Sequence, residues 1–245
     1  MDLSGKRYWL VGASEGLGRA LAVELSALGV TLVLSARGRD RLEALQAELP
    51  APSEVVPVDL RDSASVIAAA KQAGWIDGVI LTAGAYWPMP AADWDMDKVD
   101  TMFDVNLTGA ARVLSQVVPT FAAEDRGHIV IVGSLSGFRG LPGSVGYSSS
   151  KAGLMHLAEC LQADLHRTGV TVQLMNPGFF KSRLTDMNDF NMPFLMETQD
   201  AARHVVRAMQ GGRFQTCFPR LFSWVFRGGN FLPAWLYYRL FGASD

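Results

Sequence analysis

A glycine-rich turn near the start of the chain constrains its fold more than any other feature. Residues 7–11 form an apolar run of strand length, Gly12, Gly16 and Gly18 follow in a GxxxGxG pattern, and residues 19–28 carry apolar side chains at helical spacing. Glycines between a strand and a helix let the backbone approach a phosphate closely, and the first helical turn offers N–H donors to the anion. The pattern predicts a nucleotide-binding strand–turn–helix unit; the alternative is a glycine turn that only permits tight packing.

Short apolar runs alternate with helical patterns along the rest of the chain. We expect strands at residues 31–35, 54–58, 75–82, 128–133 and 170–175, and helices at 63–73, 96–123 and 147–167. Strands separated by helices form a mainly parallel sheet with helices on both faces. Because 245 residues with 49% hydrophobic content can fill one such core, and no linker or repeat interrupts them, the sequence predicts a single doubly wound α/β domain of the Rossmann type over residues 1–245.

Charge, cysteine usage and the N-terminal residues narrow the partners and the compartment. The formal net charge of −2 and the lack of a basic motif argue against nucleic-acid binding. Cys160 and Cys217 lie far apart without other metal ligands at a useful spacing, so we expect reduced thiols and no metal site. The chain enters its first strand without a signal peptide, which together with reduced thiols indicates a cytoplasmic protein.

A tyrosine and a lysine, Tyr147 and Lys151, stand one helical turn apart in the segment YSSSK. At positions i and i+4 the two side chains share one helix face. A free tyrosine has a pKa of about 10, and a neighbouring ammonium lowers that pKa and makes the phenol usable for proton transfer near neutrality. The spacing also occurs by chance on exposed polar helices, so its weight comes from the motifs around it.

Further motifs accompany this pair, and their order and spacing are jointly specific. They are Gly12-xxx-Gly16-x-Gly18, Asp59, Ala83-Gly84, Asn106, Ser134 thirteen residues before Tyr147, Lys151 and Pro177-Gly178. With these motifs the chain resembles the short-chain dehydrogenase/reductase family over about residues 5–219.

The resemblance implies hydride transfer between C4 of a nicotinamide and a carbonyl or secondary alcohol. In that chemistry Tyr147 acts as the acid/base, and Ser134 holds the substrate oxygen. Lys151 lowers the pKa of the tyrosine and binds the nicotinamide ribose, and Asn106 holds a water that relays protons to Lys151. The structural alternatives are a capped strand–loop junction for Ser134 and a helix bend for Asn106.

Residues near the glycines indicate which cofactor binds. An acidic residue about 20 positions after the glycines binds the ribose 2′-hydroxyl of NAD, whereas an arginine suits the 2′-phosphate of NADP. Ser35-Ala-Arg37 supplies an arginine and no carboxylate, so we expect NADP(H), with NAD(H) as the alternative because Glu15 lies in the glycine loop. Arg39 and Arg41 are interpreted as solubilising side chains of the next helix. The expected cofactor-binding residues are Gly12, Ser14, Glu15, Gly16, Leu17, Gly18, Arg37, Asp59, Leu60, Ala83, Gly84, Tyr147, Lys151, Pro177, Gly178 and Ser182.

By the same resemblance, residues 179–196 form a mobile segment that covers the substrate. Ser182 is expected near the cofactor carboxamide. The apolar side chains of the segment offer adaptable surface for a lipophilic substrate, or else they pack the segment onto the protein body. They are Met187, Phe190, Met192, Phe194, Leu195 and Met196.

An aromatic and arginine-rich extension, residues 213–245, ends the chain and has no acidic residue before Asp245. This mixture suits a peripheral membrane contact, a subunit contact or a flap over the substrate cleft. Residues 227–230 and Pro233 interrupt the apolar runs short of the roughly 20 residues that a spanning helix needs. We expect a homo-oligomer and, with the membrane contact formed, a position at the inner membrane surface.

The expected function is thus an NADP-preferring oxidoreductase for a lipophilic carbonyl or alcohol. Two rivals remain open: an NAD-linked alcohol dehydrogenase, and a sensor that binds NADPH without turnover. The intact set of Asn106, Ser134, Tyr147 and Lys151 argues against the sensor, which needs no acid/base machinery.

Overall fold

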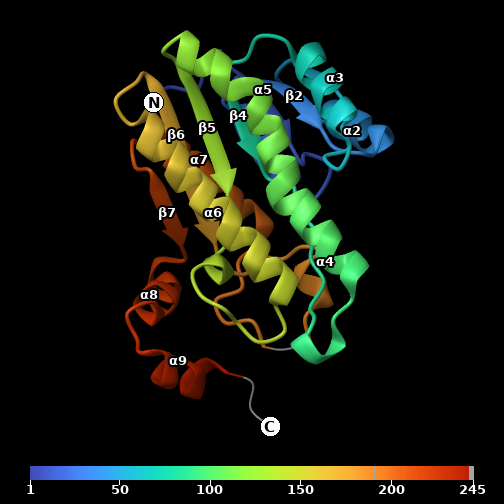
Figure 1. Ribbon diagram of the computed structural model, residues 1–245. Coiled ribbons are helices and arrows are strands. Elements are labelled where there is room, and N and C mark those ends of the chain that lie inside the picture. The colour runs from blue at the N-terminus through green and yellow to red at the C-terminus, as the bar shows by residue number, and fades with distance from the viewer. Residues whose placement is uncertain (190, 243–245) are drawn as a thin grey trace.

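The chain folds around a seven-stranded parallel sheet with the order β3-β2-β1-β4-β5-β6-β7 (Figure 1). The structure, a computed structural model, describes residues 1–189 and 191–242. The strand order reverses between β1 and β4, which opens a crevice at the carboxyl ends of these strands. The strands are β1 Arg7–Val11, β2 Thr31–Ser35, β3 Ser53–Val55, β4 Gly78–Leu81, β5 Gly127–Val132, β6 Val170–Pro177 and β7 Gln215–Phe218.

Helices cover both faces of the sheet and confirm the predicted doubly wound α/β architecture. One face carries α1 Gly16–Ala27, α2 Arg39–Gln46 and α7 Thr198–Gln210, and the other carries α3 Ser63–Ala73, α5 Gly109–Ala123 and α6 Val145–Leu165. Beyond the carboxyl end of β7 lie α8 Arg220–Gly229 and α9 Ala234–Phe241 (Figure 1). The remaining elements are α4 Met96–Phe103, a π-helical turn at Asp104–Thr108, and 3₁₀ turns at Ala91–Asp93, Leu135–Gly137 and Thr185–Met187.

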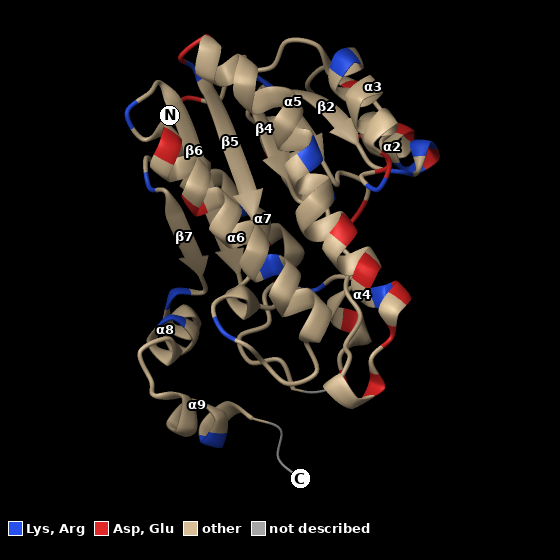
Figure 2. Ribbon diagram, viewed as in Figure 1, with Lys and Arg blue, Asp and Glu red and all other residues tan. Residues whose placement is uncertain are grey.

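Alternate side chains of each strand enter two separate apolar cores. In β1, Tyr8 and Leu10 pack on the side of α1 and α7, whereas Trp9 and Val11 pack on the side of α3, α5 and α6. Successive strand residues point to opposite faces, so a strand covered on both sides is apolar throughout. This is why the inner strands read as mainly apolar runs, and why the central strand β5 carries no Lys, Arg, Asp or Glu in Figure 2.

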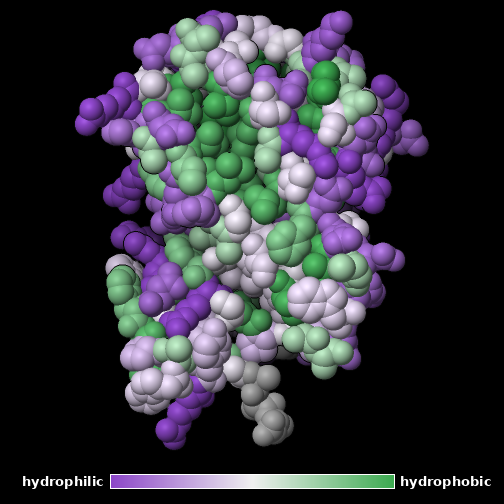
Figure 3. All heavy atoms as spheres, in the orientation of Figure 1, coloured by the Kyte–Doolittle hydropathy of each residue, from purple (hydrophilic) through white to green (hydrophobic). Residues whose placement is uncertain are grey.

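Hydrophobic side chains also gather in the groove between α5 and α6, where Figure 3 shows them from outside. Val118, Leu157 and Leu161 pack against the core beneath these helices and remain partly exposed. This surface is separate from the C-terminal helices α8 and α9 (Figure 1).

The third strand is shorter than predicted, because it ends at Val55 and not at residue 58. Beyond it, the N–H groups of Val56 and Val58 still donate to the carbonyls of Leu34 in β2 and of Ala36 just after it, both at 3.0 Å. Pro57 is tolerated between them because β3 is an edge strand, whose outer side needs no N–H donor.

Two other segments depart from the sequence prediction. The helix predicted at residues 96–123 is divided by the π-helical turn Asp104–Thr108, a local feature that often occurs at functional sites. The strand β7 was not predicted, because Gln215 and Thr216 interrupt the apolar pattern; it forms by pairing with β6.

Tyr8, His128 and Gln173 form a buried hydrogen-bonded chain across the sheet. Tyr8 Oη lies 2.8 Å from His128 Nδ1, and His128 Nε2 lies 2.9 Å from Gln173 Oε1. Burial lowers the pKa of His128 from 6.5 to about 4. Between these two pH values the unfolded chain binds a proton that the folded protein does not, so stability falls as the pH falls through this window.

We therefore expect the free energy of unfolding to drop by about 3 kcal/mol more in the wild type than in His128→Asn between pH 7 and pH 4. Urea denaturation at a series of pH values measures this difference. His166→Asn replaces an exposed histidine and should keep the wild-type pH dependence. Identical pH dependence in the wild type and His128→Asn would contradict the assignment.

Candidate active site

A cavity of about 710 Å³ opens at the carboxyl end of the sheet, in the crevice where the strand order reverses. Its volume is in the range of small-molecule sites, and its walls come from loops far apart in the sequence. Most of the predicted residues line it: Gly12, Ser14, Glu15, Gly16, Leu17, Gly18, Arg37, Asp59, Leu60, Ala83, Gly84, Tyr147, Lys151, Pro177 and Ser182.

The glycines of the first loop are required by close backbone contacts. Gly12 and Gly16 adopt φ values of 100° and 53°, in the left-handed region that favours glycine. A Cβ atom at Gly12 would lie 2.4 Å from the backbone nitrogen of Ala83, and one at Gly18 would lie 2.0 Å from the carbonyl oxygen of Gly12. The loop can therefore pass close to a bound group only with glycine at these positions.

The same loop fits the phosphates of a dinucleotide. Helix α1 begins at Gly16, directly on the cavity wall, and its capping residue Glu15 makes no side-chain cap hydrogen bond. The N–H groups of a first helical turn have no acceptor within the helix. They can donate to a pyrophosphate, with the favourable end of the helix dipole behind them.

Glu15 is held by two arginines from distant segments. Its carboxylate lies 2.9 Å from Arg41 Nη1 and 2.6 Å from Arg183 Nη2. The hydrogen bond from Arg183 is the main reason why the pKa of Glu15 is lowered, and burial opposes it. Arg41 thus lines the cavity, contrary to its interpretation as a solubilising side chain, whereas Arg39 pairs with Glu43 on the surface of α2.

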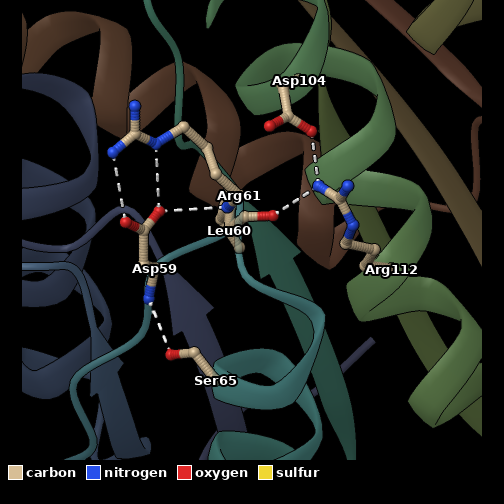
Figure 4. A network of polar contacts seen from close by, with 6 residues as sticks. All are labelled: Asp59, Leu60, Arg61, Ser65, Asp104 and Arg112. Carbon is tan, nitrogen blue, oxygen red and sulfur yellow. Dashed lines mark hydrogen bonds and ion pairs between the residues drawn. The ribbon is translucent and has the colours of Figure 1, made fainter.

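The segment after β3 is fixed on the cavity wall by two polar clusters (Figure 4). The carboxylate of Asp59 accepts from the backbone N–H of Arg61 at 3.0 Å, and the Asp59 N–H donates to Ser65 Oγ at 3.0 Å. Arg112 Nη1 donates to the Leu60 carbonyl at 2.8 Å and to Asp104 at 2.5 Å. These bonds hold the backbone at residues 59–61 in place.

Tyr147 and Lys151 lie in the first two turns of α6 and both reach the cavity. Lys151 is 4% exposed, and its Nζ donates to the carbonyl of Val132 at 2.9 Å. Burial lowers the pKa of Lys151 to about 8. Burial raises the pKa of Tyr147 to about 12; a hydrogen bond with Ser134 opposes this rise and Tyr86 adds to it.

The predicted lowering of the Tyr147 pKa by Lys151 is therefore wrong for this structure. The Lys151 Nζ lies 6.0 Å from the centre of the tyrosine ring and points its hydrogen bond at Val132. Burial, the hydrogen bond with Ser134 and the neighbouring Tyr86 set the pKa of Tyr147, and Lys151 is not among the causes of the shift.

Three predicted residues, Ser134, Gly178 and Asn106, are not among those that line the cavity. Ser134 follows β5, where its Oγ accepts from the N–H of Ser136 at 3.2 Å and lies 2.9 Å from Ser136 Oγ. Its capping role is thus present, together with its hydrogen bond to Tyr147. Gly178 packs close to Phe222, which lies 3.2 Å from the position of a Cβ atom.

Asn106, the third of them, ties two loops together. Its Oδ1 accepts from Ala85 N at 2.7 Å, and its Nδ2 donates to Ala85 O and Ser150 Oγ, both at 3.0 Å. The residue is buried in the π-helical turn, which aims its amide at the segment after β4. These contacts position the wall near Gly84 and Lys151; the predicted water relay remains a prediction.

The sequence prediction missed residues that join the cavity to the substrate-covering segment. Tyr86 packs edge-on against Tyr147 with 4.9 Å between ring centres, and its Oη donates to Asn188 at 2.6 Å. Because Tyr86 follows the Ala83-Gly84 motif by two residues, the sequence could have indicated that this tyrosine lies at the cavity. Arg183 gave no such signal, because its partner Glu15 is 168 residues away.

Residues 179–196, which are predicted to cover the substrate, form one side of the cavity through residues 180–184 and Met187. Phe194 and Leu195 are 59% and 40% exposed, although Phe194 also contacts Phe222 with 5.5 Å between ring centres, and Met196 packs against the core. Ser182 bonds with Thr185 inside the segment, and its contact with a cofactor carboxamide remains a prediction. Phe190 lies outside the described residues.

Comparisons with known proteins agree with this arrangement. The family model described as short chain dehydrogenase matches residues 6–192. An "Uncharacterized oxidoreductase" of Myxococcus xanthus is 40% identical over 225 residues, which cover 89% of each chain. A solved structure of a short chain dehydrogenase/reductase family protein is 26% identical, with a TM-score of 0.81 over 89% of this chain and 97% of the other. A solved 7β-hydroxysteroid dehydrogenase, 20% identical, shares the fold with a TM-score of 0.85 over 99% of this chain and 100% of its own. The chain therefore belongs to the short-chain dehydrogenase family.

Proposed function

We propose that the protein is an NADP-preferring oxidoreductase that transfers hydride between a nicotinamide and a lipophilic carbonyl or secondary alcohol. One observation carries the proposal: Tyr147 and Lys151 face the same cavity as the glycine loop and the start of α1. Phosphate binding and proton transfer can therefore take place within one site.

In the proposed reaction the bound nicotinamide supplies or accepts the hydride. Tyr147 donates its Oη proton to the substrate oxygen during reduction and takes it back during oxidation. Ser134, hydrogen-bonded to Tyr147, orients that oxygen. Lys151, with a pKa of about 8, is mostly protonated at neutral pH and presents its ammonium group to the ribose side of the cavity.

The preference for NADP(H) rests on the charges around the adenosine end. Arg37 and Arg41 both line the cavity. Glu15, the residue that argued for NAD(H), is paired with Arg41 and Arg183, so its charge is compensated and repels a 2′-phosphate less.

Arg37→Ala should raise the Kd for NADPH roughly tenfold and leave the Kd for NADH nearly unchanged. Only NADPH carries the ribose 2′-phosphate, which a guanidinium binds through charge-assisted hydrogen bonds. Fluorescence titration of both cofactors measures this. Arg39→Ala is the matched control, since Arg39 pairs with Glu43 on the exposed face of α2. An equal effect of Arg37→Ala on both cofactors would rule out the phosphate assignment.

A lipophilic substrate is supported by the apolar side chains that line the cavity. They include Tyr86, Trp87, Phe180, Leu184 and Met187. The cytoplasmic location and the homo-oligomer remain predictions.

NADPH consumption by the purified protein, measured against aldehydes and ketones of increasing chain length, tests the proposed function. We expect kcat/KM to rise with chain length. Turnover with NADH at equal or better efficiency would favour the NAD-linked alcohol dehydrogenase. Tight NADPH binding without oxidation, and no NADP⁺ reduction by the matching alcohols, would favour the sensor.

A further inference from the structure

The C-terminal helices α8 and α9 and the connection between them carry the most exposed large apolar side chains of the described residues. Phe231 is 89% exposed, Leu221 78% and Trp235 69%. On α8, Leu221, Trp224 and Val225 have the i, i+3, i+4 spacing of one helix face. We call the following set the C-terminal surface: Leu221, Trp224, Val225, Phe231, Trp235, Tyr238 and Leu240.

The helices that carry the C-terminal surface are held against the rest of the protein by their inner faces. On α8, Phe222 is buried, and its ring packs at a tilt against those of Phe179 and Phe194, with ring centres 5.8 and 5.5 Å apart. On α9, Tyr237 is buried, and its Oη donates to the carbonyl of Gly140 at 2.9 Å.

Arg139 fixes the connection between the two helices. Its guanidinium lies 4.0 Å from the ring centre of Tyr237 and donates to the carbonyls of Gly229 and Leu232. The exposed aromatics therefore belong to a fixed element, oriented by Arg139 and Tyr237.

The charge of this part of the chain is opposite to that of the rest. Residues 213–245 hold four arginines and one acid, Asp245, a formal charge of +3, which leaves −5 for residues 1–212. Figure 2 shows the basic residues of α8 and α9 with no acidic residue on either helix. Arg227 lies over the ring of Trp224 at 4.9 Å, so cation and aromatic face the same region.

Two occupants could cover the C-terminal surface: a bilayer or a second copy of the chain. A two-fold contact brings the same patch of both subunits together, and here it would set arginines against arginines with no carboxylate between residues 201 and 244. The groove between α5 and α6 already offers a second copy a separate apolar surface (Figure 3). An anionic bilayer, in contrast, accepts aromatic rings at its headgroup level and attracts the arginines.

We propose that α8 and α9 bind the surface of an anionic lipid bilayer. The binding is peripheral: among residues 1–189 and 191–242, no helix is long and apolar enough to cross a membrane. On the inner face of α8, buried Phe222 contacts Phe179 and Phe194, so bilayer binding brings a lipophilic substrate close to residues 179–196, which border the cavity. This last link rests on the proposed function.

Sedimentation with lipid vesicles tests the proposal on the full chain. The protein should sediment with vesicles of phosphatidylglycerol and phosphatidylcholine in equal parts, and at least tenfold less with phosphatidylcholine alone, since each arginine near an anionic surface adds roughly fivefold to the partition coefficient. Arg220→Glu with Arg227→Glu and Arg239→Glu should remove this lipid preference.

A pair of tryptophan variants provides the matched comparison. Trp224→Ser with Trp235→Ser should lower the vesicle partition coefficient at least tenfold. Trp75→Ser with Trp94→Ser, which changes two tryptophans of similar exposure (50% and 54%) elsewhere on the surface, should leave it unchanged. Thermal unfolding of each variant confirms that the fold is retained.

Three outcomes would overturn the proposal: no sedimentation with anionic vesicles, equal loss in both tryptophan pairs, or a dimer in analytical ultracentrifugation that only the Trp224 and Trp235 changes dissociate. Vesicle binding is measured without turnover. If the protein reduces short-chain carbonyls but does not bind vesicles, this inference alone is refuted. If it binds vesicles but turns over no carbonyl, only the proposed function is refuted.

Discussion

Replacing Tyr147 by phenylalanine should lower kcat by about 10³-fold or more, because the variant lacks the only hydroxyl that the proposed reaction uses as its acid/base. The Kd for NADPH should change by less than about threefold, since the ring and its position remain. The pKa of Tyr147 is raised to about 12 mainly by burial, so the phenol is fully protonated at neutral pH and ready to donate in the reducing direction.

Steady-state kinetics and NADPH titration of Tyr147→Phe test this expectation. Tyr86→Phe is the matched control: it also removes one phenol oxygen from the cavity wall, but it keeps the ring that packs against Tyr147 at 4.9 Å. It loses only the hydrogen bond to Asn188 and should retain kcat within about tenfold. Unchanged turnover in Tyr147→Phe would remove this tyrosine from the mechanism.

Replacing Gly18 by valine should destabilise the protein by about 3 kcal/mol or more and abolish measurable NADPH binding. A Cβ atom at this position would lie 2.0 Å from the backbone oxygen of Gly12 and 2.7 Å from Thr82 Oγ1. The clashing oxygen of Gly12 belongs to the backbone, which cannot rotate away as a flexible side chain can. The glycine loop must therefore move away from the start of α1. That movement separates the N–H donors from the anion they would bind.

Urea denaturation and NADPH titration of Gly18→Val measure the two effects together. Gly212→Ala is the control, because nothing lies within 4 Å of the added Cβ atom there. It should stay within about 1 kcal/mol of the wild type. Normal stability and normal NADPH affinity in Gly18→Val would show that the loop does not hold the geometry described.

The contacts around Glu15 illustrate where sequence reasoning ends. The glycine loop could be recognised because its strand, turn and helix are contiguous, and apolar periodicity or glycine spacing indicates each of them. Arg41 and Arg183 meet Glu15 across 26 and 168 residues. No local pattern encodes such a meeting, since it depends on how segments far apart in the sequence come together around the cavity.

The sequence alone determined six of the seven strands and the flanking helices, because apolar periodicity and glycine spacing act over a few neighbouring residues. Its motifs, through the family resemblance, identified most of the residues that line the cavity. Only the tertiary structure decided β7, the π-helical turn that aims Asn106, and the pKa values of Tyr147 and Lys151. Each of these depends on burial or pairing with distant segments. The sign of a pKa shift is set by the balance between desolvation and neighbouring charge, and that balance exists only once the chain has folded.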